Sequence, residues 1–341
     1  MAMESALIDR HDTLLLDLDG VVYLGRKAVR GAPEALVKAR ESGVRLAFVT
    51  NNASRTPAAI AGHLTAIGVP ATREDVVTSA QAAARLVAER VPAGSPVLVA
   101  GGMGLRQAVR ERGLRPVTTA AERPVAVLQG MWADMSYGLL TEGALAVRQG
   151  AWFVAANADT TMPTDRGVVP GNGSLTRVIA TATGTEPVVA GKPEPPLHRE
   201  SMLRTSAKRP LVVGDRLDTD IEAATRAGVD SLLVLTGVDG PATLLTAPPE
   251  HRPTHIAADL SGLYDPPAPV TEPAADKGSW TRDGWTASWD GERLHLSGDG
   301  DPVDGLRTAC AAAWSTAGKG RLTPESVQEA LDTLTTRLPP A

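Results

Sequence analysis

Short apolar runs alternate with amphipathic segments along most of this chain, and this alternation restricts the fold more than any other feature. From Thr13 to about Ala84, the apolar runs LLLDLD and RLAFVTN are each followed by a helix-like stretch, PEALVKARESG and TPAAIAGHLTAIG. Strands and helices that alternate in this way form a parallel sheet with crossover helices. Gly43 and Gly68 stand where the residue after a helix end is expected. The sequence therefore predicts an α/β fold.

Two further stretches continue this alternation of strand-like and helix-like segments, which ends near the C-terminus. The runs between PVLVAGG and GSLTRVIATATG form one series, and those between VVAGKP and DSLLVLTG form another. Residues 264–277 hold four prolines without apolar periodicity, which is typical of an extended linker. We therefore expect a core in two parts (1–78 and 187–263), an inserted α/β domain (79–186), a proline-rich linker (264–277) and a small α+β module (278–341).

The C-terminal module has its own strand and helix signals. The segments WTASWDG and ERLHLSG alternate as strands around the turn formers Asp290 and Gly291. Two helix-like segments follow, and the second opens at Thr323 with Pro324 at its first helical position. About 65 residues suffice for an appended module but not for a second enzyme of ordinary size.

The composition excludes several classes of protein. Thirty-nine acidic against thirty-four basic residues leave a net charge of −5, so no nucleic acid partner is expected. No apolar stretch approaches the roughly 20 residues that span a bilayer, so no membrane partner is expected either. The N-terminal segment lacks an apolar signal-peptide region, and the single cysteine, Cys310, cannot form an internal disulfide. We therefore expect a cytoplasmic protein.

Two carboxylates, Asp17 and Asp19, interrupt the apolar run LLLDLDG. Side chains two residues apart in a strand point to the same face, so both carboxylates would emerge together at the strand end. Two like charges that close repel unless a proton or a cation lies between them, and carboxylate oxygens suit Mg²⁺. The alternative is an acidic turn at a strand end, and this motif alone leaves both interpretations open.

A second group of acidic residues follows the strand-like run RPLVVG. Asp215 stands at the carboxyl end of this strand, where open α/β sheets bind ligands. Asp218 is placed to cap the following helix by accepting its free amides. Asp220 would support Asp215 without binding the metal itself.

Polar residues also end two other predicted strands. Thr50, Asn51 and Asn52 follow RLAFV, and a hydroxyl beside backbone N–H groups at a strand-to-helix turn suits phosphate oxygens. Ordinary turn chemistry would explain the same residues. Lys192 lies between a strand-like run and a proline-rich turn, where a lysine is usually solvated. Beside the other groups, it supplies the charge that phosphoryl transfer requires.

These four motifs stand in a recognisable order. The segments DLDGVVYLGRKAVRGAPEAL, FVTNNASRT, GKPEP and VGDRLDTDI, with a long insertion between the second and the third, resemble the haloacid dehalogenase superfamily over about residues 10–262. Within it, the match is to the branch with a large inserted cap (type C2), which includes NagD-like nucleotide phosphatases and the mammalian phosphoglycolate and pyridoxal phosphate phosphatases. The resemblance implies a Rossmann-like core with a parallel sheet, an inserted α/β cap that closes over the site, and a small phosphomonoester as substrate.

Carried over to this sequence, the resemblance implies a Mg²⁺-dependent phosphatase that works through an aspartyl-phosphate. Asp17 would attack the substrate phosphorus, and Asp19 would protonate the leaving alkoxide and then activate the hydrolytic water. Mg²⁺ would bind the Asp17 carboxylate, the Asp19 carbonyl oxygen and Asp215. Three further residues would hold the phosphoryl group: Thr50, Asn51 and Lys192.

Substrate specificity would lie in the cap. The stretch QGMWADMSYG places Trp132 and Asp134 between a strand and a helix, and PGNGSL places Gly171 and Asn172 at a turn and helix start. These four residues are candidates for substrate contacts. The aromatic residues Trp132 and Tyr137 could equally belong to the cap core or to a contact between caps. Because the mammalian relatives dimerise through their caps, a homodimer is an open alternative.

The C-terminal module resembles the extra segment of actinobacterial members of this branch. One of them is a mycobacterial glycerol 3-phosphate phosphatase, whose extension is similar to part of an acetyltransferase fold. Without a pyrophosphate loop, the module is too short to bind acetyl-CoA. The resemblance makes glycerol 3-phosphate the first expected substrate, with 2-phosphoglycolate, pyridoxal 5′-phosphate or a nucleotide as alternatives.

Two hypotheses from other classes compete with a phosphatase. A sensor would bind a phosphorylated ligand without turnover, and the intact set Asp17, Asp19, Lys192 and Asp215 argues against it. A nicotinamide oxidoreductase would need a glycine fingerprint after the first strand, where this sequence has DLDGVV.

Overall fold

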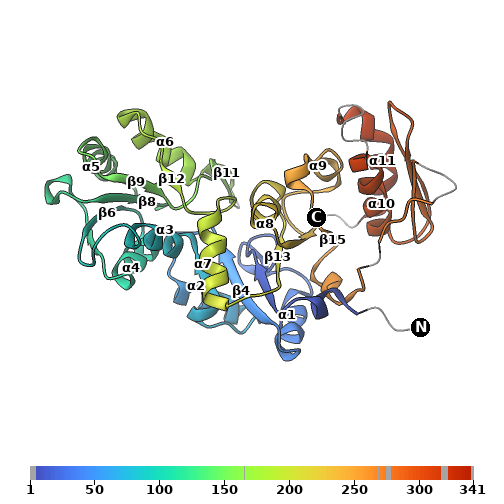
Figure 1. Cartoon of the computed structure of the whole chain (residues 1–341), viewed down its shortest axis with the longest axis horizontal. Coiled ribbons are helices and arrows are strands. Elements are labelled where there is room, and N and C mark those ends of the chain that lie inside the picture. The colour runs from blue at the N-terminus through green and yellow to red at the C-terminus, as the bar shows by residue number, and fades with distance from the viewer. Residues whose placement is uncertain (1–4, 165, 268, 274–277, 316–321, 339–341) are drawn as a thin grey trace. The chain divides into compact units, whose positions relative to one another are not determined.

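The computed structural model describes residues 5–164, 166–267, 269–273, 278–315 and 322–338 (Figure 1). The chain forms two compact units. The first comprises the described parts of 1–24, 28–44 and 209–341, and the second comprises the described parts of 25–27 and 45–208. Most of the second unit is therefore inserted into the sequence of the first.

Parallel strands in the order β15, β14, β13, β1 form the centre of the first unit. Leu14 pairs with Leu211 and Leu16 with Val213, and all four side chains are fully buried. Runs of this kind are apolar throughout because both faces of a parallel sheet are covered. The elements are β1 Thr13–Leu16, β2 Tyr23–Leu24, β3 Lys27–Ala28, α1 Ala32–Glu41, β13 Pro210–Gly214, α8 Glu222–Ala227, β14 Asp230–Val234, α9 Pro241–Leu245 and β15 His255–Ala257.

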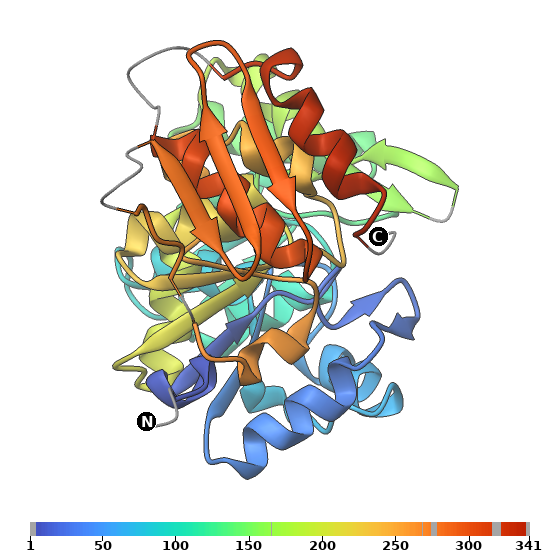
Figure 2. The same cartoon turned by 90° about the vertical axis from the view of Figure 1, so that its right-hand side faces the viewer.

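The C-terminal module is a three-stranded antiparallel sheet with two helices, and Figure 2 shows its strands nearest the viewer. The predicted turn is confirmed, because Asp290 Oδ1 accepts the N–H groups of Glu292 and Arg293 at 2.8 Å and Gly291 has a φ of 107°. Pro324 has helical dihedral angles, but a 3₁₀ turn precedes the last α-helix. The elements are β16 Ser279–Arg282, β17 Trp285–Trp289, β18 Leu294–Gly298, α10 Pro302–Ser315 and α11 Gln328–Thr335.

The module shares a hydrophobic core with the parallel sheet of the first unit. Leu233 and Ile256 of the sheet belong to the same buried cluster as Trp285 and Leu306 of the module. In the expected linker, Thr271 exchanges backbone hydrogen bonds with Thr281 of β16 at 2.8 and 3.1 Å. Residues 268 and 274–277 of that linker lie outside the described residues. Core packing, and not the linker alone, therefore holds the module on the sheet.

The second unit contains a parallel pair, β4 and β5, and a five-stranded parallel sheet in the order β12, β9, β8, β6, β7 (Figure 1). This confirms the predicted α/β character of the inserted segment. Helix α2 ends at Ala66 and Gly68 has a φ of 90°, as the sequence predicted. The elements are β4 Arg45–Thr50, α2 Pro57–Ala66, β5 Val76–Thr78, α3 Ser79–Ala88, β6 Pro96–Ala100, α4 Met103–Glu111, β7 Arg115–Val117, β8 Ala126–Gln129, α5 Tyr137–Arg148, β9 Trp152–Ala155, β10 Thr161–Thr164, β11 Gly167–Pro170, α6 Asn172–Thr183, β12 Val188–Val189 and α7 Pro195–Thr205.

A buried ion pair network links three segments of the second unit. Glu200 of α7 is fully buried and accepts hydrogen bonds from Arg85 of α3 and, at 2.7 Å, from Arg112, which follows α4. The Glu200 carboxylate raises the pKa of Arg85. A buried charge that loses its partners is strongly destabilising, so this network should hold the three segments together.

We expect Glu200→Gln to lower the free energy of unfolding by about 3 kcal/mol, because the two guanidinium groups lose their buried counter-charge. The matched control is Glu186→Gln, which removes an exposed pair with Arg177 at 2.9 Å and should change stability by less than about 0.5 kcal/mol. The midpoint of urea unfolding measures both effects. Equal midpoints for the two variants would show that the buried network contributes nothing.

Candidate active site

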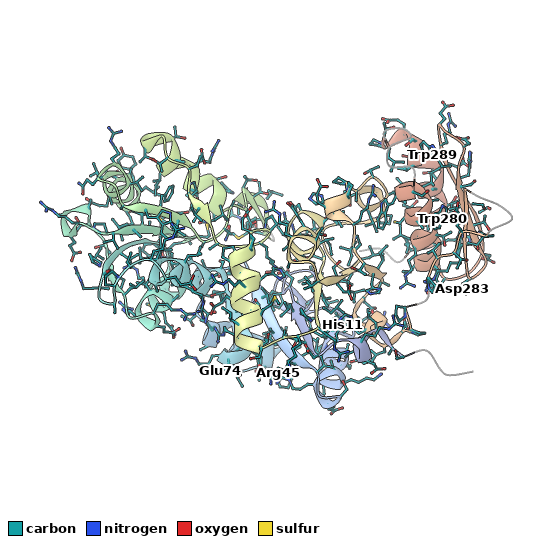
Figure 3. The ribbon with its side chains drawn as sticks, in the orientation of Figure 1. His11, Arg45, Glu74, Trp280, Asp283 and Trp289 are labelled. Carbon is teal, nitrogen blue, oxygen red and sulfur yellow. The ribbon has the colours of Figure 1, made fainter. Side chains whose placement is uncertain are left out.

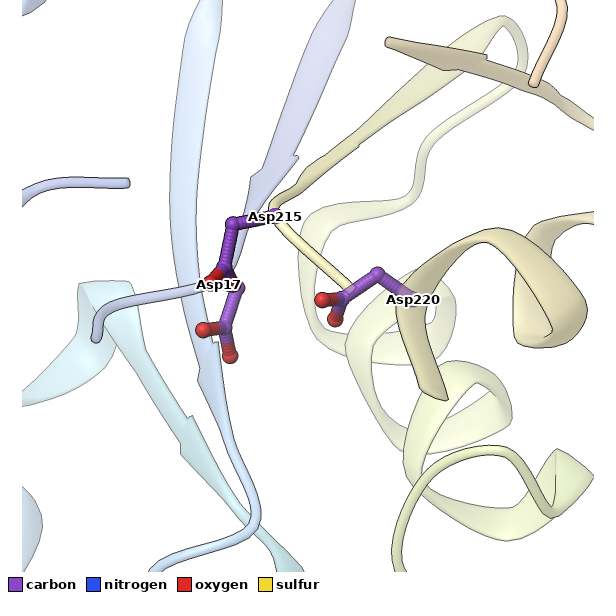
Figure 4. A group of neighbouring side chains, drawn as sticks. All are labelled: Asp17, Asp215 and Asp220. Atoms are coloured by element: carbon purple, nitrogen blue, oxygen red, sulfur yellow. The ribbon is translucent and has the colours of Figure 1, made fainter. Parts of the chain in front are cut away.

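Three carboxylates lie together in the first unit: Asp17, Asp215 and Asp220 (Figure 4). One carboxylate oxygen from each lies within 4.8 Å of the others. Asp215 and Asp220 are each 1% exposed, and Asp17 is half-buried. The sequence predicted Asp17 and Asp215 at this place, and it predicted that Asp220 would support Asp215 without binding the metal itself.

The ends of two neighbouring strands position this cluster. Asp17 directly follows β1, and its N–H donates to Val213 O of β13 at 2.8 Å. Asp215 directly follows β13, and its Oδ2 accepts the N–H of Val238 at 2.8 Å. Asp220 lies in a π-helical turn, Leu217–Ile221, and accepts the N–H of Arg216 at 3.3 Å. The carboxyl ends of parallel strands thus deliver both Asp17 and Asp215 to one edge of the sheet.

Glycines make the room that the cluster needs. A Cβ atom on Gly237 would lie 1.9 Å from Asp215 Oδ2, and one on Gly20 would lie 2.3 Å from the same oxygen. A Cβ atom on Gly214 would lie 2.1 Å from the Cβ of Asp220. Any side chain at these positions would displace a carboxylate of the cluster.

The charges of this cluster call for a cation. At an effective dielectric constant of about 20, two unit charges within 4.8 Å repel by roughly 3.5 kcal/mol or more. Nearly complete burial of Asp215 and Asp220 limits screening by water. Hard divalent cations take carboxylate oxygens as ligands, and Mg²⁺ binds through one or two carboxylates together with water and phosphate oxygens. The donor set therefore fits Mg²⁺.

The structure differs from the sequence-based prediction at two acidic residues. Strand β1 ends at Leu16, so Asp19 lies in the loop beyond the strand, and its side chain is exposed and stands outside the three-carboxylate cluster. The prediction that Asp218 caps a helix is wrong. Its carboxylate pairs with the Arg216 guanidinium at 2.9 and 3.0 Å, because the chain forms a π-helical turn here and leaves the side chain outside it.

We expect Gly237→Ala to lower kcat/KM by about 100-fold, because a displacement of about 1 Å at a catalytic group has that effect. The new methyl group would push the Asp215 carboxylate away from its present place. The matched control is Gly240→Ala in the same loop, where a Cβ atom meets nothing within 4 Å. Steady-state kinetics with an aryl phosphate measure both variants. Normal activity of Gly237→Ala would contradict this role of the glycine.

In the second unit, Asn51 and Lys192 form a two-way pair of hydrogen bonds. The backbone N–H of Lys192 donates to Asn51 Oδ1 at 2.8 Å, and Asn51 Nδ2 donates to Lys192 O at 3.1 Å. Lys192 is only 4% exposed, and its Nζ donates to Val49 O at 3.2 Å. A Cβ atom on Gly191 would lie 2.5 Å from Asn51 Oδ1, so a glycine is needed before the lysine. Lys192 is thus a buried lysine in a fixed position.

Thr50 stands next to this pair at the end of β4. Its side chain is buried, and its Oγ1 accepts the N–H of Asn52 at 3.1 Å. Asn52 Oδ1 in turn accepts the N–H groups of Ser54 and Arg55 at 3.0 Å, so it shapes the turn itself. Among the sequence-predicted residues, the structure thus groups Asp17, Asp215 and Asp220 in one unit and Thr50, Asn51 and Lys192 in the other.

The sequence interpretation missed three residues that fix Asn51. Asn51 Nδ2 also donates to the Asp159 carboxylate at 3.2 and 3.4 Å. The backbone oxygen of Asn51 accepts from Asn157 Nδ2 at 2.6 Å and from Ser79 Oγ at 2.7 Å. The polar run ANAD, just after the apolar run WFVA, is the sequence signal that could have identified Asn157 and Asp159.

The four cap candidates have different surroundings. Asn172 is buried, and its amide is engaged at both ends, with Gln129 Nε2 at 2.9 Å and Asn157 O at 2.7 Å. Gly171 is buried against the chain itself, since a Cβ atom there would lie 2.3 Å from Asp159 O. Trp132 is half-buried and Asp134 is exposed. Trp132 and Asp134 therefore keep side-chain surface for a ligand, whereas Asn172 holds the cap fold.

Comparisons with known proteins agree with this geometry. Residues 14–115 match the model of haloacid dehalogenase-like hydrolases, and residues 189–263 match a second, HAD-hydrolase-like model. A D-glycerol 3-phosphate phosphatase of Mycobacterium tuberculosis is 49% identical over 259 residues, which cover 76% of this chain and 72% of that relative. The chain belongs to the haloacid dehalogenase-like hydrolases.

Other members of the family extend this likeness. The 5′-nucleotidase YutF of Bacillus subtilis is 42% identical over 66% of this chain and 87% of its own length. A crystal structure of a glycerol phosphate phosphatase from M. tuberculosis in complex with magnesium has a TM-score of 0.84 at 43% identity, over 92% of this chain and 93% of that one. The protein is an enzyme of this family, a phosphatase, and the phosphatases of the family use Mg²⁺.

The C-terminal module has a match of its own. Residues 282–335 match the model of a GCN5-related N-acetyltransferase-like domain. This confirms the expected likeness of the module to part of an acetyltransferase fold.

Proposed function

We propose that this hydrolase converts glycerol 3-phosphate to glycerol and phosphate through an aspartyl-phosphate. The cluster of Asp17, Asp215 and Asp220 is the observation that carries the chemistry, because three close carboxylates suit a cation and a nucleophile. The choice of substrate rests on the 49% identity to the mycobacterial D-glycerol 3-phosphate phosphatase.

Asp17 and Asp19 carry the bond changes in this proposal. A carboxylate oxygen of Asp17 attacks phosphorus, the ester P–O bond breaks, and Asp19 gives its proton to the leaving alkoxide. Asp19 then takes a proton from water, and that water attacks the phosphorus of the aspartyl-phosphate. Phosphate leaves, and the Asp17 carboxylate is restored. The exposed position of Asp19 suits a group that exchanges protons with a leaving alcohol and with water.

Thr50 and Lys192 hold the phosphoryl group, the first through its hydroxyl and the second through its charge. Asn51 contributes its backbone N–H, because its side-chain amide is already paired with the peptide groups of Lys192. Asp159 keeps that amide in place. The side chains of Asn51 and Asp159 therefore position Lys192, whereas the Asn51 backbone N–H contacts the phosphoryl group.

Asp17, Asp215 and the Asp19 carbonyl oxygen would hold Mg²⁺, and Asp220 would either bind it through water or hold Asp215 in position. Bound there, the ion would neutralise the carboxylates and the phosphate and so lower the barrier to attack. The chain's own contribution is a fixed, buried set of oxygens that needs little rearrangement.

A phosphate-release panel tests the choice of substrate. Glycerol 3-phosphate, 2-phosphoglycolate, pyridoxal 5′-phosphate and a nucleoside monophosphate would be compared on the full chain with Mg²⁺. We expect kcat/KM for glycerol 3-phosphate to exceed that of the other compounds by at least about tenfold, which corresponds to about 1.4 kcal/mol of transition-state binding. Equal rates across the panel would overturn the proposed substrate, and binding without turnover would favour a sensor.

The remaining features of the molecule stay predictions. These are the domain limits 1–78, 79–186, 187–263, 264–277 and 278–341, the cytoplasmic location, and a homodimer through the cap. Among the described residues, no helix has both the length and the apolar character that a membrane span requires. Size-exclusion chromatography with light scattering would decide the oligomeric state.

A further inference from the structure

A cavity of about 340 Å³ lies in the first unit, where the C-terminal module packs against the parallel sheet. Its wall comes from strands β14, β15 and β16, from helix α10, and from residues 7, 10, 253, 254, 262, 265–267, 269 and 270. Small-molecule sites in proteins begin at about 300 Å³, so the cavity can hold a small organic molecule. None of the groups assigned to the phosphatase site lines it.

Much of the wall is apolar. Leu232 of β14 and Ile256 of β15 lie on the sheet side, and Trp314 lies on the helix side. Cys310 of α10 also faces the cavity, and complete burial raises the pKa of its thiol, so this side chain is neutral. Such a wall would cover an aromatic ring or an alkyl chain.

Two arginines of the wall share one carboxylate. Asp304 Oδ1 lies 2.5 Å from Arg282 Nε and 2.6 Å from Arg307 Nη1, and Arg307 Nε also donates to Ile256 O at 2.9 Å. Asp283, labelled in Figure 3, lies 3.7 Å from Arg282, but its side chain is 68% exposed and its charge is screened by water. Among the described residues, the two guanidinium groups thus share the largely buried carboxylate of Asp304.

Arg10 and His255 add two groups that are free to bind. Neither side chain has a hydrogen-bond or ion-pair partner among the described residues, and both line the cavity. Burial lowers the pKa of His255 to about 4, although the nearby Asp230 carboxylate acts to raise it. The His255 ring is therefore neutral at pH 7 and can donate one hydrogen bond. Asp265 is the one acidic side chain among the described wall residues, against three arginines.

We propose that this cavity binds a small organic anion with an apolar body, of the class of aromatic or aliphatic monocarboxylates. The apolar wall would cover the ring or chain, and Arg10, Arg307 and His255 would hold the carboxylate. Because the wall comes from both the sheet and the module, a bound ligand would stabilise the module on the sheet. This site is separate from phosphate hydrolysis and does not depend on which substrate the enzyme uses.

Benzoate is the probe, with benzamide as its neutral analogue, and isothermal titration of the full chain measures binding. Inorganic phosphate and Mg²⁺ are present throughout, so that benzoate does not occupy an anion site beside Lys192. We expect one benzoate per chain with a Kd of about 1 mM, as ligands of this size bind well-formed pockets. Benzamide should bind at least about tenfold more weakly, because it lacks the charge.

Two variants locate the site. Ala311→Phe fills the cavity from α10 and should abolish benzoate binding, and Arg10→Gln should weaken it by about tenfold. The matched control is Arg293→Gln in the exposed turn before β18, which should bind as the wild type does. Circular dichroism checks that every variant is folded. The proposal is overturned if the wild type does not bind benzoate up to about 20 mM, if benzamide binds equally well, or if folded Ala311→Phe and Arg10→Gln both bind like the wild type.

Discussion

Asp17→Asn is expected to lower kcat for phosphate release by at least about 10⁴-fold, because an amide oxygen cannot take the place of the carboxylate nucleophile. The side chain keeps its size, and its backbone N–H still donates to Val213 O at 2.8 Å. The fold should therefore persist. Phosphate release from an aryl phosphate with Mg²⁺ measures the loss.

The matched control for this substitution is Asp218→Asn. Asp218 is close in sequence to Asp215 and Asp220, but its side chain is 56% exposed and pairs with Arg216 outside the cluster. We expect its kcat to stay within about twofold of the wild type, as for most surface substitutions. If Asp17→Asn and the wild type hydrolyse the substrate alike, the assignment of Asp17 as nucleophile is wrong.

Asp215→Asn is expected to raise the Mg²⁺ concentration for half-maximal activity by about 100-fold or more. Loss of a residue that only supports a metal ligand weakens metal binding by about 10- to 100-fold, and loss of the ligand itself should weaken it more. The amide can still accept the N–H of Val238, which now lies 2.8 Å from Oδ2. A titration of activity against Mg²⁺ gives the midpoint.

Excess Mg²⁺ separates a metal ligand from a nucleophile. High Mg²⁺ should restore part of the rate of Asp215→Asn, whereas it should not restore Asp17→Asn, which lacks the reacting group. Asp220→Asn tests whether Asp220 binds the ion directly, because a residue that only supports a ligand should raise the Mg²⁺ midpoint less than a ligand does. An unchanged Mg²⁺ midpoint in Asp215→Asn would remove Asp215 from the metal site.

Local patterns explain why much of this site could be predicted from the sequence. Asp17, Thr50 and Asp215 each follow directly on a buried apolar run, and the carboxyl end of a parallel strand is a common place for ligands. The sequence motif identifies Lys192 as a candidate, but it does not predict that the Lys192 side chain is buried. A lysine in such a turn is solvated in most proteins, and only the packed structure encloses this one.

Other residues could not be assigned because their contacts join distant parts of the chain. Asp159 contacts Asn51 across 108 residues, and no sequence period connects the two. The place of Asp220 depends on a π-helical turn and on the missing side chain of Gly214. A side chain at position 237 would clash only because tertiary packing places the Asp215 carboxylate beside it.

Local patterns in the chain were enough to predict the α/β alternation, the strand ends and the polar residues at those ends, because hydrophobic periodicity and turn chemistry are local properties. Three features are visible only in the tertiary structure: Asp220 joins Asp17 and Asp215, the Asn51 side chain hydrogen-bonds the backbone of Lys192, and the C-terminal module shares the core of the parallel sheet. These depend on close packing between segments far apart in the chain, where a distance of about 1 Å decides whether two groups interact.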